Sequence, residues 1–180
     1  MITIEDIEAY TLQDVALSFR PSVEQWIDQV STYIERSTNR EFVTGDSPSI
    51  RKYDGSGTYV QLIDDHSSLV SVTVDGATFD VTTYPANSTP KYKLVADTPF
   101  PKGRQNVEVM AVWGYGDIPE DIKFVCTVLV AGMVQNHTKS DGAMASESIG
   151  NYSVSYATDA QRDDFNRAKE ILAMYRVHHL

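Results

Sequence analysis

The sequence predicts an α+β fold, in which a small bundle of three to four helices carries an inserted antiparallel β-sheet. Apolar residues recur every three or four positions near both ends of the chain, as on one face of a helix. Between about residues 50 and 116 the pattern changes to short β-branched and aromatic runs separated by turn-forming pairs. We therefore expect a single domain over residues 1–180, with a helical core from 1–45 and 117–180 and the β insertion between them.

Two helices are predicted in the first 39 residues. The longer one spans residues 21–39, where Pro21 suits a first turn and Ser22 with Gln25 has the spacing of a capping box. A shorter helix is expected to follow Thr3 as its cap. Five apolar residues share one face of the longer helix: Val23, Trp26, Ile27, Val30 and Ile34.

The middle of the chain predicts antiparallel strands within residues 51–63, 68–81, 91–95 and 106–115. Asp54-Gly55 and Asp75-Gly76 are typical of two-residue hairpin turns, because such turns need positive φ angles that glycine tolerates. The acidic pair before His66 reads as a solvated loop between two of these strands. Neither glycine-rich stretch, YDGSGT nor WGYGDIP, has the context of a nucleotide-binding loop.

Pro119 predicts the start of the next helix, which is apolar nearly all round and is therefore expected to be buried. The densest apolar faces of this helix and of 21–39 predict a helical core made of Trp26, Ile27, Val30, Ile122, Cys126 and Leu129. A last helix is expected to be capped by Asp159 and to continue to the final residue. It carries a seam spaced three and four residues apart: Phe165, Ala168, Leu172, Tyr175 and His179.

The stretch ESIGNYSVSY, residues 147–156, alternates like a strand between a polar loop and the last helix. Apolar or aromatic residues recur at nearly every second position: Ile149, Tyr152, Val154 and Tyr156. The preceding run, residues 138–146, has almost no apolar side chain to anchor it, so we expect it to become ordered only on assembly. The alternating stretch predicts an edge strand or hairpin. It could pack across a subunit boundary or pair within its own subunit.

Composition excludes several function classes. A formal net charge of −10 with only 15 Lys and Arg makes tight nucleic-acid binding improbable, because phosphate contacts need basic side chains. The first residues lack the features of a secretory signal and the single Cys126 cannot form an internal disulfide, so we expect an intracellular protein. The longest strongly apolar stretch, residues 124–134, is about half of what a membrane span requires.

No catalytic constellation stands out, and we expect no catalytic residues, no metal site and no cofactor. His66 follows Asp64 and Asp65, but adjacent strand residues face opposite ways, so a metal site or base there is the minority interpretation. Cys126 lies on the apolar side of a predicted buried helix and lacks the exposure of a nucleophile. There is neither a GxSxG nor an HExxH motif.

The order of these parts resembles the head–tail connector proteins of tailed bacteriophages, also called adaptor or head completion proteins. The resemblance covers nearly the whole chain. It depends on the order in which several motifs follow one another, rather than on any single motif. These are Arg40 with Phe42, Tyr53-Asp54-Gly55, the strand from Val107 to Gly116 leading into Pro119, and Ser148-Ile149-Gly150-Asn151-Tyr152-Ser153-Val154.

The resemblance implies a structural virion protein at the head–tail interface, assembled in the bacterial cytoplasm. Such proteins form a ring, commonly of twelve copies, beneath the portal, extend the DNA channel and carry a downstream stopper or tail-completion protein. Genomic DNA would pass through without sequence-specific binding, and no membrane is involved. The inter-subunit candidates are Ile149, Tyr152, Val154 and Tyr156, and the portal-docking candidates are Phe165, Leu172, Tyr175, Arg176, His178, His179 and Leu180.

Two other classes of function stay open at this level. One is a monomeric, non-catalytic binding module that uses the β insertion. The other is a small metal-dependent hydrolase that uses Asp65 and His66. A mass measurement in the presence of portal separates the ring from the binding module, and loss of metal-dependent turnover on His66→Ala would indicate the hydrolase.

Overall fold

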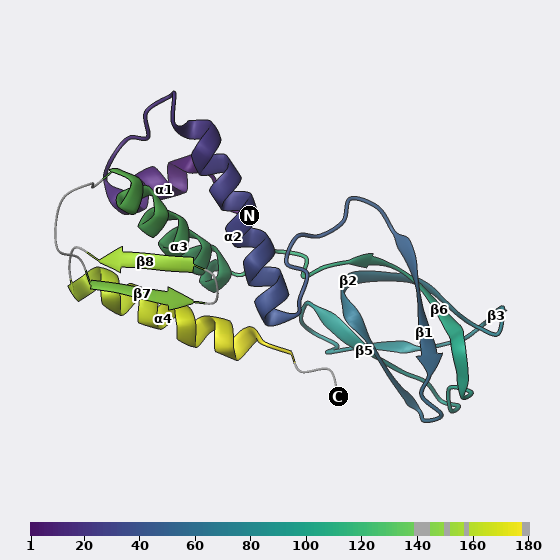
Figure 1. Ribbon diagram of the computed structural model, residues 1–180. Helices are drawn as coiled ribbons and strands as arrows, with labels where there is room; N and C mark the ends of the chain where they lie inside the picture. Colours follow the sequence, from purple (N-terminus) through teal and green to yellow (C-terminus); the bar gives the residue numbers. More distant parts are fainter. Residues whose placement is uncertain (139–144, 150–151, 157–158, 178–180) are drawn as a thin grey trace. The chain divides into compact units, whose positions relative to one another are not determined.

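The computed structural model describes residues 1–138, 145–149, 152–156 and 159–177 (Figure 1). The chain forms two compact units, which we call the helical unit and the sheet unit. The helical unit comprises Met1–Asn39 and Pro119–Leu180, and the sheet unit comprises Arg40–Ile118. The predicted α+β class, helices at both ends of the chain with an antiparallel sheet between them, is confirmed.

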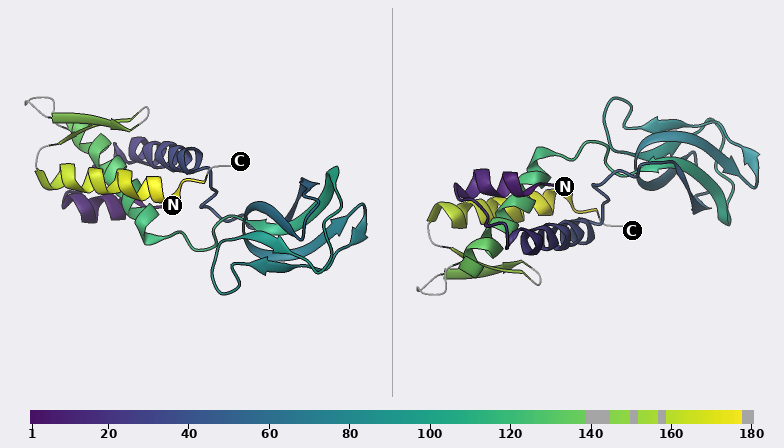
Figure 2. Two further views of the ribbon diagram at one scale, coloured as in Figure 1. Left: turned by 90° about the horizontal axis from the view of Figure 1, so that it is seen from below. Right: turned by 90° about the horizontal axis from the view of Figure 1, so that it is seen from above.

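The helical unit contains α1 (Ile4–Thr11), α2 (Arg20–Thr38), α3 (Glu120–Thr138) and α4 (Asp159–Tyr175). Helix α3 is central, since α1, α2 and α4 all pack against it (Figures 1 and 2). Its all-round apolar composition is explained by this position. A hydrogen bond of 2.7 Å from the Tyr10 hydroxyl to Asp164 Oδ2 also ties α1 to α4. No helix in the described part of the chain is long and apolar enough to span a bilayer.

The helix ends agree with the sequence patterns only in part. Thr3 forms the predicted cap of α1, in a reciprocal capping box with Asp6. The predicted capping box of Ser22 with Gln25 is wrong. Helix α2 begins at Arg20 after Phe19, which makes no side-chain cap, and Pro21 lies in the first turn as expected. Helix α4 begins at Asp159 but ends at Tyr175, so the prediction that it continues to the last residue is wrong.

The predicted helical core is confirmed except at one position. Ile27, Val30, Ile122, Cys126 and Leu129 are all buried. Trp26 is only half-buried and instead lies edge-on to the Phe19 ring at 5.3 Å and to the His137 ring at 5.9 Å. Burial raises the pKa of the Cys126 thiol to about 11, so the predicted lack of reactivity has a physical cause.

The alternating stretch forms a hairpin in the helical unit. Strands β7 (Ala145–Ile149) and β8 (Tyr152–Tyr156) pair antiparallel in a two-stranded sheet, with Ile149 opposite Tyr152 and Ala145 opposite Tyr156. Strand β8 lies beside α3 and α4 (Figure 1). The predicted hairpin is thus confirmed. Residues 139–144, most of the polar run expected to be mobile, lie outside the described residues.

The sheet unit is built on one antiparallel sheet. Its strands are β1 (Ser49–Gly55), β2 (Val60–Val74), β3 (Ala77–Thr78), β4 (Thr82–Tyr84), β5 (Lys91–Val95) and β6 (Gly103–Trp113). They are ordered β1-β6-β2-β5-β4, and β3 pairs with the far end of β2. The core lies on one face, where alternate residues of β6 (Val107, Val109, Ala111 and Trp113) are buried together with Val72, Val74, Leu94 and Phe100.

The two aspartate–glycine pairs have different roles. Asp75 and Gly76 have φ angles of 50° and 81° and connect the paired residues Val74 and Ala77, so this predicted hairpin is confirmed. The hairpin at Asp54-Gly55 is wrong, because both residues belong to β1, which pairs with β6 rather than with β2. A Cβ atom on Gly55 would lie 1.9 Å from the Pro101 carbonyl oxygen. This glycine therefore serves close backbone approach rather than a turn.

Strand β2 is continuous through the acidic pair, and the predicted solvated loop at His66 is wrong. The strand passes from β5 as partner to β6, with register shifts on both sides of His66. Such irregularities re-aim side chains within a strand. They leave the His66 side chain fully buried.

Candidate functional site

The motif residues Arg40 and Phe42 lie beside the glycine-rich end of β6, where the chain enters and leaves the sheet unit. Phe42 is fully buried, with its ring 5.2 Å from that of Tyr115. The Thr44 hydroxyl accepts a hydrogen bond from the Gly116 amide and donates one to the Gly116 carbonyl oxygen, both at 2.8 Å. Hydrogen bonds thus join two segments, about 70 residues apart in the sequence, at the place where the chain enters and leaves the sheet unit.

An ion pair between Arg40 and Asp65 also stabilises this end of the sheet unit. Arg40 Nη1 donates to both carboxylate oxygens of Asp65, at 2.7 and 3.0 Å, and the two side chains are 19% and 9% exposed. The Asp65 carbonyl oxygen accepts from the Gly114 amide at 2.9 Å. Because a buried charge is costly without its partner, removing either side chain is expected to loosen the entry and exit of the sheet unit.

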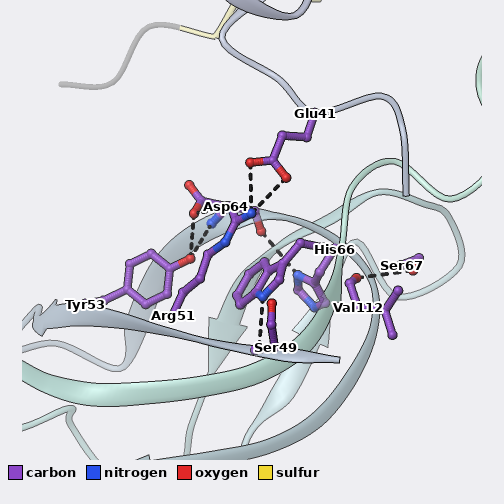
Figure 3. A network of polar contacts seen from close by, with 9 residues as sticks. Glu41, Ser49, Arg51, Tyr53, Asp64, His66, Ser67 and Val112 are labelled. Carbon is purple, nitrogen blue, oxygen red and sulfur yellow. Dashed lines mark hydrogen bonds and ion pairs between the residues drawn. The ribbon is translucent and has the colours of Figure 1, made fainter. Parts of the chain in front are cut away.

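A second polar network is centred on Arg51 and Asp64 (Figure 3). Arg51 on β1 donates to Asp64 Oδ2 on β2 at 2.8 Å and to both carboxylate oxygens of Glu41 at 2.8 Å. Its guanidinium carbon lies 4.5 Å from the Trp113 ring centroid, a cation–π contact. The Tyr53 hydroxyl also donates to Asp64 Oδ2, at 2.8 Å. The network joins β1 and β2, which are separated in the sheet by β6.

The surroundings raise the pKa values of two members of this network, Arg51 and Tyr53. Burial lowers the pKa of Arg51, but its hydrogen bonds to Glu41 and Asp64 outweigh this, and the net pKa is raised. Burial, together with the Asp64 carboxylate, raises the pKa of the Tyr53 hydroxyl. Arg51 therefore stays charged and Tyr53 neutral at any physiological pH.

His66 is held as a neutral, buried ring. Its Nδ1 donates to the Asp64 carbonyl oxygen at 3.3 Å, since a carbonyl oxygen can only accept. Its Nε2 is buried without a hydrogen-bond partner in the described part of the chain. Burial lowers the pKa of His66 below its ordinary value. The ring lies edge-on to Trp113, with 6.1 Å between centroids.

This geometry does not provide what the hydrolase hypothesis requires. The Asp65 carboxylate bonds to Arg40, whereas His66 faces the Asp64 backbone and is closed off from solvent. Among the described residues, no group of three His, Cys, Asp or Glu side chains could hold a metal ion. Asp65 and His66 are thus each engaged in a separate structural contact.

The portal-docking candidates fall into three environments. Phe165 is fully buried and Leu172 is 8% exposed, so both pack within the helical unit. Tyr175 is half-buried at the end of α4, and Arg176 is exposed. The amide of Val177 donates to the Thr38 carbonyl oxygen at 2.8 Å, which ties the segment after α4 to the end of α2. His178, His179 and Leu180 lie outside the described residues.

The inter-subunit candidates are brought together by the β7–β8 hairpin. The register places Ile149 opposite Tyr152, while Val154 and Tyr156 follow at alternate positions of β8. The two strands form a two-stranded sheet of their own.

Sequence reasoning missed two features. One is the network of Arg51, Asp64 and Glu41, whose members have no regular spacing. The other is a pair of almost fully exposed leucines, Leu12 and Leu17, which belong to no helical stripe. The exposure of the leucines could have been predicted, because neither leucine lies on the apolar face of a predicted helix.

The sequence matches the family described as "Head completion protein" over residues 1–178. The chain belongs to the head completion protein family. This family assignment confirms the resemblance found in the sequence.

The fold also agrees with that of one chain in a solved structure of a particle neck. A chain of the structure described as "Neck of empty GTA particle computed with C6 symmetry" matches with a TM-score of 0.59 and 12% sequence identity. The match covers 99% of this chain and 91% of the neck chain. A comparison with curated proteins found no match. At this low identity, the likeness to the neck chain establishes a shared fold.

Proposed function

We propose that this head completion protein is a structural connector at the head–tail interface of a tailed phage or phage-like particle. The observation that carries the proposal is the family match over residues 1–178. Its fold resembles that of a chain in a particle neck. The ion pairs and the buried His66 described above support a non-enzymatic role.

In this proposal, copies of the chain form a ring beneath the portal protein, extend the DNA channel and offer a platform to a stopper or tail-completion protein. A ring of twelve is compatible with the C6 symmetry of the neck particle whose chain has this fold. The net charge of −10 suits a channel wall along which DNA slides, since an acidic surface repels phosphate. In this proposal DNA passes through the channel and is not bound as a ligand.

The experiment mixes the purified protein with portal rings from the same particle and measures mass and particle images. We expect an added ring on one face of the portal. A protein that stays monomeric at all concentrations with portal present would refute the connector role and favour the monomeric binding module.

We further propose that the end of the chain after α4 docks onto the portal. Phe165 and Leu172 hold α4 in the helical unit, and Arg176, just after this helix, is exposed and available for contact. Arginine and aromatic side chains are common interface anchors.

Deletion of residues 176–180 tests the docking proposal. We expect a folded, soluble protein that no longer binds portal, so that filled heads leak DNA. The matched control is Val177→Pro, which removes the amide that bonds to Thr38 but keeps the length of the chain. Normal portal binding by the deletion variant would refute docking, and equal loss in both variants would assign the effect to the Thr38 bond.

A further inference from the structure

Two leucines in the connection between α1 and α2 are presented to solvent rather than packed. Leu12 is 88% exposed and Leu17 is 84% exposed. Leu12 also has a φ angle of 55°, in the left-handed region that a bulky residue rarely adopts. Leu12 is the C-cap of α1, so its φ angle is explained by the end of the helix. The exposure of both leucines has no such local cause and points to contact with a partner.

The connection that carries these leucines is braced from within. Between them, Val15 is buried and its amide donates to Glu8 Oε1 at 2.9 Å. The same Glu8 oxygen accepts from Arg20 Nη2 at 2.9 Å, so α1 and the start of α2 hold the connection together. The leucines are therefore displayed by a fixed segment, which lowers the entropy cost of binding. We call residues 12–17 the leucine loop.

The sheet unit exposes an apolar surface of its own. The pairing of β2, β5 and β4 places Leu62, Lys93 and Tyr84 in one row across the three strands. The next row on this face contains Val60, which is 38% exposed, and Leu62 itself is 65% exposed. On the opposite face of these strands, Gln61, Ile63 and Leu94 are buried. We call the set Val60, Leu62, Tyr84, Lys93 and Val95 the outer sheet patch.

The two surfaces are complementary in charge as well as in polarity. Lys93 lies 5.5 Å from the Tyr84 ring centroid and has no carboxylate partner among the described residues. The exposed Asp14 lies between the two leucines. Residues 1–39 carry seven carboxylates against two basic residues: Glu5, Asp6, Glu8, Asp14, Glu24, Asp28 and Glu35 against Arg20 and Arg36. Asp14 of the leucine loop and Lys93 of the outer sheet patch thus carry opposite charges, each among exposed apolar residues.

We infer that the leucine loop of one copy docks onto the outer sheet patch of a neighbouring copy. The contact joins different surfaces of the two copies, which is the type of interface that closes into a ring when the rotation between copies fits. Leu12 and Leu17 supply the apolar contact and Asp14 faces Lys93. This inference rests on the proposed connector function and specifies which surfaces meet between copies.

Cross-linking tests the contact directly. Leu17→Cys and Leu62→Cys are made as separate variants, mixed in equal amounts with portal rings, and treated with a short bismaleimide. The native Cys126 is buried, with a pKa raised to about 11, so it does not compete. We expect cross-linked pairs in the mixture at a yield about tenfold above either variant alone, because each contact needs one cysteine from each surface.

Substitutions test the energetics with matched controls. Leu17→Asp is expected to lower the assembled fraction about tenfold or more, because a charge would be buried in an apolar contact. Met174→Asp, at a methionine that is 72% exposed on α4, is the control and should assemble normally. Lys93→Glu should weaken assembly, whereas the control Lys102→Glu should not. Combining Asp14→Lys with Lys93→Glu exchanges the two charges and should restore assembly.

The outcomes separate this inference from the proposed function. A portal-bound ring that forms without the Leu17–Leu62 cross-link, or that tolerates Leu17→Asp, overturns the contact and leaves the connector role in place. Cross-linking of Leu17→Cys to itself also overturns it, since the two surfaces would then be the same. If the native chain adds no ring to the portal, both proposals fail.

Discussion

Replacing Gly114 by alanine should destabilise the sheet unit strongly. Gly114 has a φ angle of 107°, and a Cβ atom there would lie 2.7 Å from the Val43 carbonyl oxygen and 2.8 Å from Thr44 Cα. Both contacts are to backbone, and the Gly45 amide, which donates to the Trp113 carbonyl oxygen at 3.1 Å, limits how far the neighbouring segment can shift. The substitution thus combines backbone strain with overpacking.

The magnitude follows from these two contributions. A strained φ angle costs about 1–3 kcal/mol and overpacking a further 1–3 kcal/mol, so the free energy of unfolding should fall by about 2–6 kcal/mol. Gly76→Ala is the matched control. Its φ angle is 81° but nothing lies within 4 Å of the added Cβ, so it should cost only about 1–2 kcal/mol.

Urea unfolding followed by tryptophan fluorescence measures the difference. In a Trp26→Phe background the remaining tryptophan, Trp113, reports on the sheet unit. With an m value of about 1–3 kcal/mol/M, Gly114→Ala should lower the midpoint by about 2 M, and Gly76→Ala by less than about half of that. Equal shifts for the two variants would refute the argument that close approach at Val43 requires glycine.

Two further predictions concern the cores of the two units. Leu129→Ala should cost about 2–5 kcal/mol of unfolding free energy, because the side chain is 1% exposed in α3. Met174→Ala should stay within about 0.5 kcal/mol, and an unchanged melting temperature for Leu129→Ala would contradict the core assignment. Burial of His66 lowers its pKa from the ordinary 6.5, with Lys91 lowering it further and Asp65 opposing this. The folded state therefore holds this proton less tightly than the unfolded state does, so stability is fully present above about pH 6.5 and falls as the pH drops below it. His66→Gln should flatten the dependence of stability on pH below about pH 6.5, and an unchanged slope would show that His66 does not titrate on unfolding.

The helices could be derived from the sequence because their causes are local. Apolar residues one turn apart, such as Ile27 and Val30, face the same side of any helix, and Pro21 and Pro119 favour first turns wherever the helix packs. The same holds for the turn at Asp75-Gly76, whose two residues connect adjacent strands. The family resemblance likewise came from the order of motifs, which needs no coordinates.

The partners of the strands were decided only by the tertiary structure. Asp54-Gly55 has the composition of a turn, but its residues are used against a segment about 50 positions away: Asp54 Oδ1 accepts from the Gln105 amide at 2.7 Å, and Gly55 lies against Pro101. Nothing in the local sequence specifies that β1 pairs with β6 rather than with β2. Such pairing depends on which long-range contacts bury the most apolar surface.

The burial of side chains likewise depends on residues far away in the sequence, as the acidic stretch before His66 shows. Two aspartates and a histidine read as a solvated loop, because burying them without partners would be costly. Their partners are Arg51 for Asp64 and Arg40 for Asp65, 13 and 25 positions away in the sequence. The sequence by itself determined the fold class, the helices and the family of this protein. The tertiary structure decided which charges are paired, which histidine is buried and which leucines are left exposed, since each depends on residues that only the folded chain brings together.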